Sequence, residues 1–300
     1  MRPVVALVTA REARGLDEDM PLLEAALEAA GARSQMVDWD DGAVDWGAFD
    51  LTLLRSTWDY IDRLQEFLTW VDTAARRTTL LNPPAVVRWN TDKHYLAELA
   101  RAGVPVVPTM FIEPGESADR ALQDFLGRHG NSAEFVVKPS VGAGSRDTER
   151  HLREQVEPAV AQAQRLLNAE RSVLLQPYLD SVDRDGETAL IYFAGQFSHA
   201  IRKGPLLPPG LGGSPAVGLF APEQISPRTP GVDELRVAER VLAALPFAAP
   251  LYARIDLIRD AAGAPALLEL ELTEPSLFFA HAPGAAERFT SVVLEVAATD

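Results

Sequence analysis

Residues 251–275 (LYARIDLIRDAAGAPALLELELTEP) constrain the fold more than any other stretch of this chain. Residues 251–258 and 266–273 have the pattern of β-strands, and a turn punctuated by glycine and proline separates them. Alternate side chains of a strand point to the same face of a sheet. An antiparallel hairpin centred between Ala262 and Gly263 therefore decides which side chains of the two runs become neighbours.

Three carboxylates and one guanidinium converge on one face of this predicted hairpin. The pairing sets Asp256 opposite Glu269. The same register sets Arg254 opposite Glu271. Carboxylates this close repel one another unless a cation lies between them, and Mg²⁺ usually takes one or two carboxylates together with phosphates. The face is either a Mg²⁺–nucleotide site or the solvated outer face of an edge hairpin, and this stretch alone leaves both interpretations open.

The composition is that of a globular protein and excludes several kinds of site. The 300 residues are 47% hydrophobic and 24% charged, which is enough for two or three subdomains with their own cores. There is no cysteine, so thiolate catalysis, disulfides and cysteine metal sites are excluded. The net charge of −15, without a cluster of Lys and Arg, argues against nucleic-acid binding. Neither a signal peptide nor a membrane-spanning run is evident, so we expect a cytoplasmic protein without a membrane partner.

The first 84 residues predict a parallel α/β domain. A near-continuous apolar run at residues 3–9 is typical of a strand buried on both faces. Asp17 or Asp19 is expected to cap the helix that follows. Alternation of further strands with helices indicates a parallel sheet. The further predicted strands are 34–39, 50–55 and 79–82.

The loop after the strand at residues 50–55 reads RSTWDY and is a candidate substrate site. Ligand sites of open α/β sheets lie beyond the carboxyl ends of the strands. Arg55 could hold a substrate carboxylate in a bidentate pair, or it could form an ordinary Arg–Asp bridge in a structural loop. The candidate substrate-binding residues are Arg55, Trp58, Asp59 and Tyr60.

Residues 135–148 (FVVKPSVGAGSRDT) join a strand that carries Lys138 to a glycine-rich loop. Glycines let backbone N–H groups approach phosphates, and a lysine adds a positive charge. The loop matches neither GxxxxGK[ST] nor GxGxxG, and it could be a plain turn. A helix is predicted at residues 151–169.

The strand at residues 172–179 ends in Gln-Pro-Tyr-Leu. Proline ends ladder pairing, which is typical of a plain strand end but would also free backbone groups for an adenine edge. A hairpin follows at residues 187–193 and 196–202, centred on Ala194-Gly195. The Gly/Pro-rich residues 204–218 predict a long irregular loop, and loops of this length are usually functional or disordered.

The order of these features resembles the ATP-grasp superfamily, most closely its glutathione-synthetase-like and RimK-like ligases, over about residues 81–279. The resemblance implies an α/β fold of the α+β ATP-grasp type. An N-terminal parallel α/β domain (1–84) would precede an ATP-grasp domain (85–300). In the latter, two α+β subdomains, one of them a lid of about residues 108–176, would hold ATP between them.

The resemblance also implies roles for individual residues, with ATP and Mg²⁺ (or Mn²⁺) as cofactors. Residues implied to bind the nucleotide are Lys93, Lys138, Gly142, Gly144, Ser145, Gln176, Tyr178, Leu179, Glu187 and Arg202. Residues implied to bind the metal are Asp256, Glu269 and Glu271. Residues implied to take part in catalysis are Arg254, Arg202 and Lys138.

Two positions depart from the superfamily pattern. The usual final pair is Glu-x-Asn, whereas this chain has Glu269-Leu270-Glu271, which keeps the oxygen ligand and adds a negative charge. Ala189 stands where some relatives carry a substrate-binding arginine, so the acceptor pocket should differ from that of glutathione synthetase.

Within the superfamily, LLRSTWDY, LNPP, TDKHYL and LLELELTEPSLFF are together similar to the cyclo-ligase family of cycloserine biosynthesis. This resemblance implies ATP-dependent cyclisation of a small-molecule carboxylate, O-ureido-D-serine, to D-cycloserine, in a homo-oligomeric enzyme. Three alternatives stay open: an intermolecular amide ligase acting on amino acids or peptides, a small-molecule kinase, and a nucleotide-binding module without chemistry.

Overall fold

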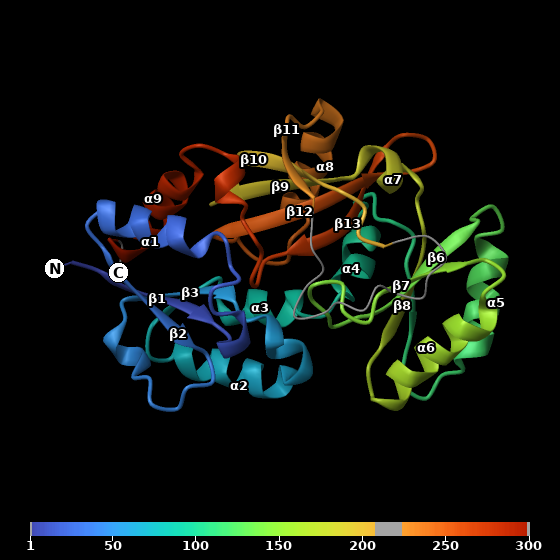
Figure 1. Ribbon diagram of the computed structural model, residues 1–300, viewed down its shortest axis with the longest axis horizontal. Helices are drawn as coiled ribbons and strands as arrows, with labels where there is room; N and C mark the ends of the chain where they lie inside the picture. The colour runs from blue at the N-terminus through green and yellow to red at the C-terminus, as the bar shows by residue number, and fades with distance from the viewer. Residues whose placement is uncertain (1, 208–223, 299–300) are drawn as a thin grey trace.

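The computed structural model describes residues 2–207 and 224–298. Three β-sheets with helices packed around them form an elongated molecule (Figure 1). We call them the N-terminal sheet, the central sheet and the distal sheet. The last helix (Ala285–Ala297) packs against the first long helix (Met20–Ala29), beside the N-terminal sheet (Figure 1). The greater part of the predicted 204–218 loop falls outside the described residues.

The N-terminal sheet is parallel, as predicted, with strand order β2-β1-β3-β4. Val5 and Leu7 of β1 pack with Leu23 of α1 on one face. Ala6 and Val8 lie on the other face in a cluster with helix α2. Strand alternation thus gives both faces an apolar cover. The elements are β1 (Val4–Thr9), α1 (Met20–Ala29), β2 (Arg33–Asp38), β3 (Leu51–Ser56), α2 (Leu64–Ala75) and β4 (Thr79–Leu81).

The central sheet is antiparallel, with strand order β11-β10-β9-β12-β13. The predicted register of its last hairpin is confirmed, because Asp256 pairs with Glu269 and Arg254 pairs with Glu271. The turn itself is centred on Ala262, half a residue before the predicted centre. A register shift between Asp256 and Leu257 places one extra residue in β13, and the predicted pairs Asp256–Glu269 and Arg254–Glu271 result. The strands are β9 (Glu187–Phe193), β10 (Gln196–Lys203), β11 (Ile225–Arg228), β12 (Tyr252–Arg259) and β13 (Pro265–Glu271).

The distal sheet is antiparallel, with strand order β5-β8-β6-β7, and packs against helices α5 and α6. The helix predicted from residue 151 begins only at Val156, because Arg150 and His151 pair with β6 instead. The elements are β5 (Met110–Ile112), α5 (Ala118–Arg128), β6 (Glu134–Pro139), β7 (Glu149–Leu152), α6 (Val156–Asn168) and β8 (Val173–Pro177).

Further helices connect the three sheets. The segment beginning at Pro84 is helix α3, since proline suits the first turn of a helix. The other helices are α4 (Tyr95–Arg101), α7 (Ser181–Asp185), α8 (Val232–Ala243) and α9 (Ala285–Ala297), and α3 spans Pro84–Asn90. In the described segments, none of the helices combines the length and apolarity needed to cross a bilayer.

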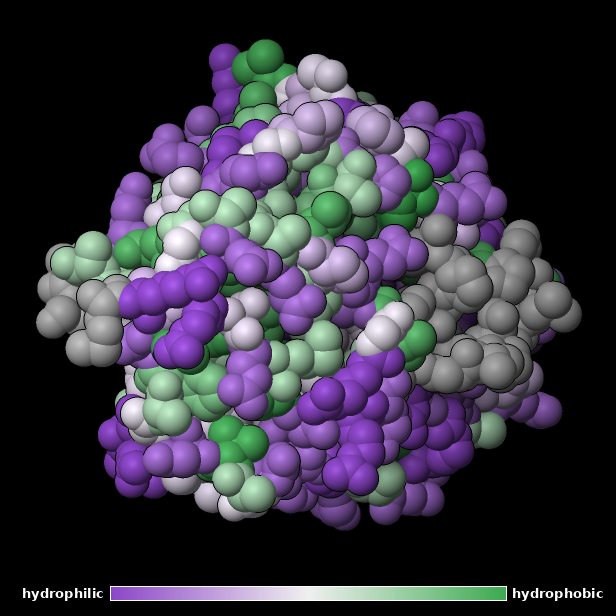
Figure 2. Space-filling view, turned by 60° about the vertical axis from the view of Figure 1, so that its left-hand side comes forward, coloured by the Kyte–Doolittle hydropathy of each residue, from purple (hydrophilic) through white to green (hydrophobic). Residues whose placement is uncertain are grey.

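The surface is ordinary in composition where it can be followed. On the face shown in Figure 2, hydrophilic residues cover much of the molecule, and hydrophobic residues lie between them in small patches. Apolar atoms contribute a large share of the surface of any folded protein. Small hydrophobic patches of this kind on the surface therefore need no functional explanation.

Asn82 connects the N-terminal sheet to the β12–β13 hairpin of the central sheet by hydrogen bonds. Its amide nitrogen donates to the carbonyl oxygens of Tyr252 (3.0 Å) and Leu272 (2.8 Å). Its side-chain oxygen accepts from the backbone N–H of Leu251 at 2.6 Å. Asn82 is fully buried, so each of these groups would be unsatisfied without its partner.

We expect Asn82→Ala to lower the free energy of unfolding by about 3 kcal/mol, because it leaves buried backbone groups without partners. Denaturant unfolding followed by circular dichroism measures the change. The control is Asn168→Ala, which removes an exposed asparagine from the end of α6 and should change the free energy little. An equal effect of the two substitutions would refute the structural role of Asn82.

His94 links the start of α4 to the distal sheet. Its ring nitrogens contact Asp92 (2.6 Å) and Glu113 (2.9 Å), and its ring stacks on Phe111. Burial by itself lowers the pKa of His94, but the hydrogen bonds to the two carboxylates outweigh it, and the net shift is upward.

A raised pKa means that the charged form of His94 stabilises the folded state below the unfolded-state value of about 6.5. This contribution is lost as the pH rises through the folded-state value. We therefore expect His94→Gln to destabilise the protein more at pH 5.5 than at pH 9, as measured by thermal unfolding at both values. A destabilisation that grows with pH would contradict the assignment.

Candidate functional site

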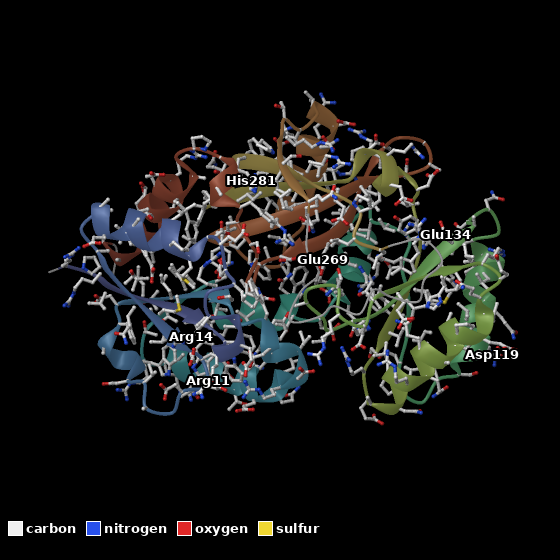
Figure 3. The ribbon with its side chains drawn as sticks, viewed as in Figure 1. Arg11, Arg14, Asp119, Glu134, Glu269 and His281 are labelled. Carbon is white, nitrogen blue, oxygen red and sulfur yellow. The ribbon has the colours of Figure 1, made fainter. Side chains whose placement is uncertain are left out.

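The three sheets enclose a cavity of about 320 Å³, a volume within the range of small-molecule sites. Loops of the N-terminal sheet, strands β6 and β8 of the distal sheet, and β13 of the central sheet form its wall. Glu269 lies near the middle of the molecule, between the N-terminal and distal sheets (Figure 3). The cavity therefore lies where segments distant in sequence meet.

Most of the residues singled out from the sequence line this cavity. They are Trp58, Tyr60, Lys93, Lys138, Gly142, Gly144, Ser145, Gln176, Tyr178, Leu179, Glu187, Arg254, Glu269 and Glu271. Four candidates are not among its lining residues: Arg55, Asp59, Arg202 and Asp256. The hairpin face is thus interior, and the interpretation as a solvated outer face is wrong.

Lys93 connects the hairpin to the glycine-rich loop. Its ammonium lies 2.9 Å from Glu269 Oε1 and donates to the carbonyl oxygen of Gly142 at 2.8 Å. Burial would raise the pKa of Glu269, but the charges of Lys93 and Lys138 lower it to about 2. Glu269 is therefore a carboxylate at any physiological pH.

Lys138 differs from Lys93 in having no counter-ion among the residues that the structure describes. It is 8% exposed and lines the cavity from strand β6. No hydrogen bond or ion pair to its ammonium is found within residues 2–207 and 224–298. Burial, only partly offset by Glu269, lowers its pKa. A buried ammonium without a partner is costly, so an anionic ligand is the natural partner for it.

Arg254 organises the other half of the carboxylate face. Its guanidinium donates to Asp256 Oδ1 at 3.0 Å, to the carbonyl oxygen of Ser276 at 3.2 Å, and to Glu271. Burial raises the pKa of Glu271, and the positive charge of Arg254 only partly offsets this effect. Repulsion by Glu269 and Asp256 raises the pKa further, to about 7. Glu271 would accept a further cation.

The metal prediction must be narrowed from three residues to two. The described residues contain no group of three or more His, Asp or Glu side chains placed to hold a metal ion. Asp256 is fully buried and bonded to Arg254 and Lys203. Glu269 and Glu271 remain, since both line the cavity from one face of β13. Two carboxylates with phosphates are a sufficient donor set for Mg²⁺.

Lys203, and not Arg202, faces the cavity from strand β10. The ammonium of Lys203 lies 3.1 Å from Glu187 Oε2 and 3.0 Å from Asp256 Oδ2. Arg202 instead donates to the backbone carbonyl oxygen of Asp185. A register shift between Phe197 and His199 sets Lys203, rather than Arg202, opposite Glu187. Sequence analysis named Arg202 on the family resemblance and did not single out Lys203.

Arg55 and Asp59 do not line the cavity and are bound to other groups of the protein. The side chain of Arg55 is completely buried, 3.4 Å from Asp19 and 3.7 Å from Asp17. Asp19 begins α1 but does not cap it, because its carboxylate accepts from the backbone N–H groups of residues 277–279. Asp59 accepts from the indole N–H of Trp39 at 2.8 Å. Bidentate capture of a substrate carboxylate by Arg55 is not supported by this geometry.

The strand end at residues 176–179 lines the cavity, but it is less open than its proline suggests. The backbone N–H of Tyr178 donates to the carbonyl oxygen of Glu134 at 3.0 Å. The carbonyl oxygen of Leu179 accepts from the N–H of Val182. The Tyr178 ring is held by Arg150, whose guanidinium lies 3.5 Å from the ring centroid. These two backbone groups are therefore already paired.

Tyr60 and Trp58 meet the end of the hairpin at Glu274, a residue that sequence analysis did not single out. Tyr60 hydrogen-bonds to the Glu274 side chain, and the indole N–H of Trp58 donates to its carbonyl oxygen at 3.5 Å. Burial, together with the charge of Glu271, raises the pKa of Glu274 to about 8. The available sequence signal was its position directly after β13.

Comparison with known proteins finds relatives that align along nearly the whole chain. Residues 5–82 match the family model described as the N-terminal domain of D-cycloserine synthetase DcsG. The cycloserine biosynthesis protein DcsG of Streptomyces lavendulae is 42% identical over 297 residues, which cover 97% of this chain and 98% of that protein. The crystal structure of D-cycloserine synthetase DcsG superimposes with a TM-score of 0.92 at 41% identity, covering 98% of this chain and 99% of that one.

More distant structures share the fold. The ATP-grasp ligase PsnB, solved with a minimal precursor variant, Mg and ADP, has a TM-score of 0.66 at 16% identity and covers 98% of both chains. The D-alanine–D-alanine ligase of Bacillus anthracis has a TM-score of 0.69 at 15% identity, covering all of this chain and 98% of that one. The full-length match at 42% identity decides the assignment: the chain belongs to the D-cycloserine synthetase family and is an ATP-dependent ligase with the ATP-grasp fold.

Proposed function

We propose that the protein uses ATP to activate the carboxylate of O-ureido-D-serine and closes it on a nitrogen of the same molecule, giving D-cycloserine. The names of the relatives that align along the whole chain support this product. The observation that carries the nucleotide part is Lys138, a buried cavity ammonium for which no ion pair is found in the described chain. Phosphate oxygens would provide the missing counter-charge.

The nucleotide in this proposal lies between the distal and central sheets. Lys93 and Lys138 would hold its triphosphate, and Lys203 would take the part that the resemblance gives to Arg202. The Gly142–Ser145 turn covers the phosphates and keeps water away from the activated carboxylate. The base and ribose lie against the remaining candidates, which are Gln176, Tyr178, Leu179 and Glu187.

Glu269 and Glu271 fit one divalent cation, because they share a face and both reach the cavity. A bound Mg²⁺ (or Mn²⁺) supplies positive charge to the phosphates during transfer. Asp256, enclosed by Arg254 and Lys203, orients these two cationic side chains. In this proposal Asp256 positions Arg254 and Lys203, and only Glu269 and Glu271 bind the metal ion.

Arg254 lies beside the reacting carboxylate in this scheme and neutralises the charge that develops as the acyl phosphate forms. The ureido-oxy nitrogen then attacks the acyl carbon, and phosphate leaves. The carbamoyl group departs as carbon dioxide and ammonia, with consumption of one water molecule. Trp58 and Tyr60 border the substrate end.

We propose a domain division that follows the sheets. Residues 1–84 would form the preceding α/β domain, and residues 85–300 the ATP-grasp domain with its lid at about 108–176. The distal sheet, from β5 to β8, supports this lid assignment. Closure of the lid would bring Lys138 and the glycine-rich loop onto the phosphates.

Release of ADP from a panel of carboxylates, including O-ureido-D-serine and its L-isomer, tests the proposal. Hydroxylamine separates the alternatives, because a ligase yields a hydroxamate from its substrate, whereas a kinase yields a stable phosphoester. An intermolecular ligase would release ADP only with an added amine. Turnover of O-ureido-D-serine to the ring product supports the proposal, and no ADP release with either isomer refutes it.

A further inference from the structure

Glu274 is a carboxyl group in the cavity wall that the proposed handling of ATP does not use. The residue is 8% exposed and lines the cavity beyond the end of β13. In the described chain, no ion pair of its side chain is found. Buried carboxylates without a counter-ion are costly, and those in clefts are candidates for ligand recognition. The position of Glu274 is therefore informative about the ligand.

The surroundings of Glu274 are aromatic and acidic. Trp58, Tyr60 and Phe278 line the same cavity, and aromatic ring faces attract ammonium groups. The negative charge of Glu271 also acts on Glu274. A small cation would find a carboxyl group, aromatic rings and further negative charge at this end of the cavity.

Glu274 also lies within electrostatic reach of the reaction centre. Burial and the charge of Glu271 raise its pKa, while the positive charges of Lys93 and Arg254 act in the opposite direction. Arg254 in turn donates to the carbonyl oxygen of Ser276 and lies 5.5 Å from the Phe278 ring centroid. A cation-accepting group and an anion-accepting group are thus neighbours on one wall.

An α-amino acid carries its carboxylate and its ammonium on one carbon, so it needs two neighbouring partners of opposite charge. We propose that Glu274, held by Tyr60, receives the α-ammonium group of the substrate whose carboxylate lies beside Arg254. The inference rests on the proposed function and assigns the amino group of that substrate. Its consequence is selection of α-amino acids over carboxylates that lack the amino group.

The experiment compares O-ureido-D-serine with its analogue lacking the α-amino group, 3-(ureidooxy)propanoate. We expect Glu274→Gln to lower kcat/KM for the amino acid about a hundredfold, because a charged hydrogen bond is lost, and to change kcat/KM for the analogue less than threefold. Tyr60→Phe, which keeps the ring and removes the hydrogen bond, should lower kcat/KM for the amino acid about tenfold.

Asp119→Asn is the matched control, because it removes one carboxylate from exposed helix α5, at the far edge of the distal sheet from Glu269 (Figure 3). It should leave both substrates unaffected. Equal losses on the two substrates in Glu274→Gln would overturn the inference, since a merely structural role lowers both. If the wild-type protein turns over neither compound, the proposed function fails, and calorimetric binding of the two compounds to the wild-type and Glu274→Gln proteins still decides whether Glu274 recognises the ammonium group.

Discussion

Lys138→Met should lower the affinity for ATP about a hundredfold and at the same time raise the thermal stability of the nucleotide-free protein. The affinity falls because the charged hydrogen bonds to phosphate, about 3 kcal/mol, are lost. The stability rises because burial lowers the pKa of Lys138, so the charged form is less stable in the folded chain than in the unfolded chain. Isothermal titration calorimetry and thermal unfolding measure the two effects.

The prediction is specific because ATP affinity should fall while thermal stability rises. Arg128→Ala removes an exposed cation from the end of α5 and should change neither quantity appreciably. Unchanged nucleotide affinity in Lys138→Met would remove Lys138 from the phosphate site. A loss of stability would mean that its ammonium has a protein partner after all.

Glu271→Ala should lower kcat about a thousandfold at saturating ATP, which is at the upper end of the effect of removing one electrostatic group from an active site. Two losses combine, because Glu271 is one of two cavity carboxylates on the face of β13 and also a partner of Arg254. Steady-state ADP release at several Mg²⁺ concentrations measures kcat and the metal requirement together.

Glu271→Asn separates the contribution of the negative charge of this residue from the contribution of its oxygen donor. Asparagine keeps an oxygen donor and is the usual residue of the superfamily, so this variant should retain activity within about tenfold of the wild-type level. Glu287→Ala, on the exposed face of α9, should behave as wild type. If Glu271→Ala retained the activity of this control, Glu271 would have no part in the metal site.

The two hairpins of the central sheet show how far sequence alone could reach. For the last hairpin, the assumed centre between Ala262 and Gly263 was off by half a residue, and the register shift beside Asp256 compensated for it. For the hairpin around Ala194, a shift between Phe197 and His199 moved every later pair by one. Because a one-residue slip turns each side chain to the other face, Lys203 faces the cavity and Arg202 does not line it.

Long-range contacts account for the other differences. Strand β7 forms at residues predicted to begin a helix, because β6 provides a pairing partner. Asp19 was expected to cap a helix, but it binds the backbone of residues 277–279 more than 250 positions away. Local pattern describes what a segment favours in isolation and does not include such partners.

The sequence by itself determined the chemistry available to this protein: two lysines, a glycine-rich loop and an acidic hairpin in the order of an ATP-grasp ligase. Alternation along β13 was sufficient to place Glu269 and Glu271 on one face. The tertiary structure alone decided which charges remain available to a ligand. Asp256 and Arg55 are buried in ion pairs, whereas Lys138 and Glu274 meet the cavity without one in the described chain. Burial and pairing depend on all three sheets at once, which no single stretch of sequence can specify.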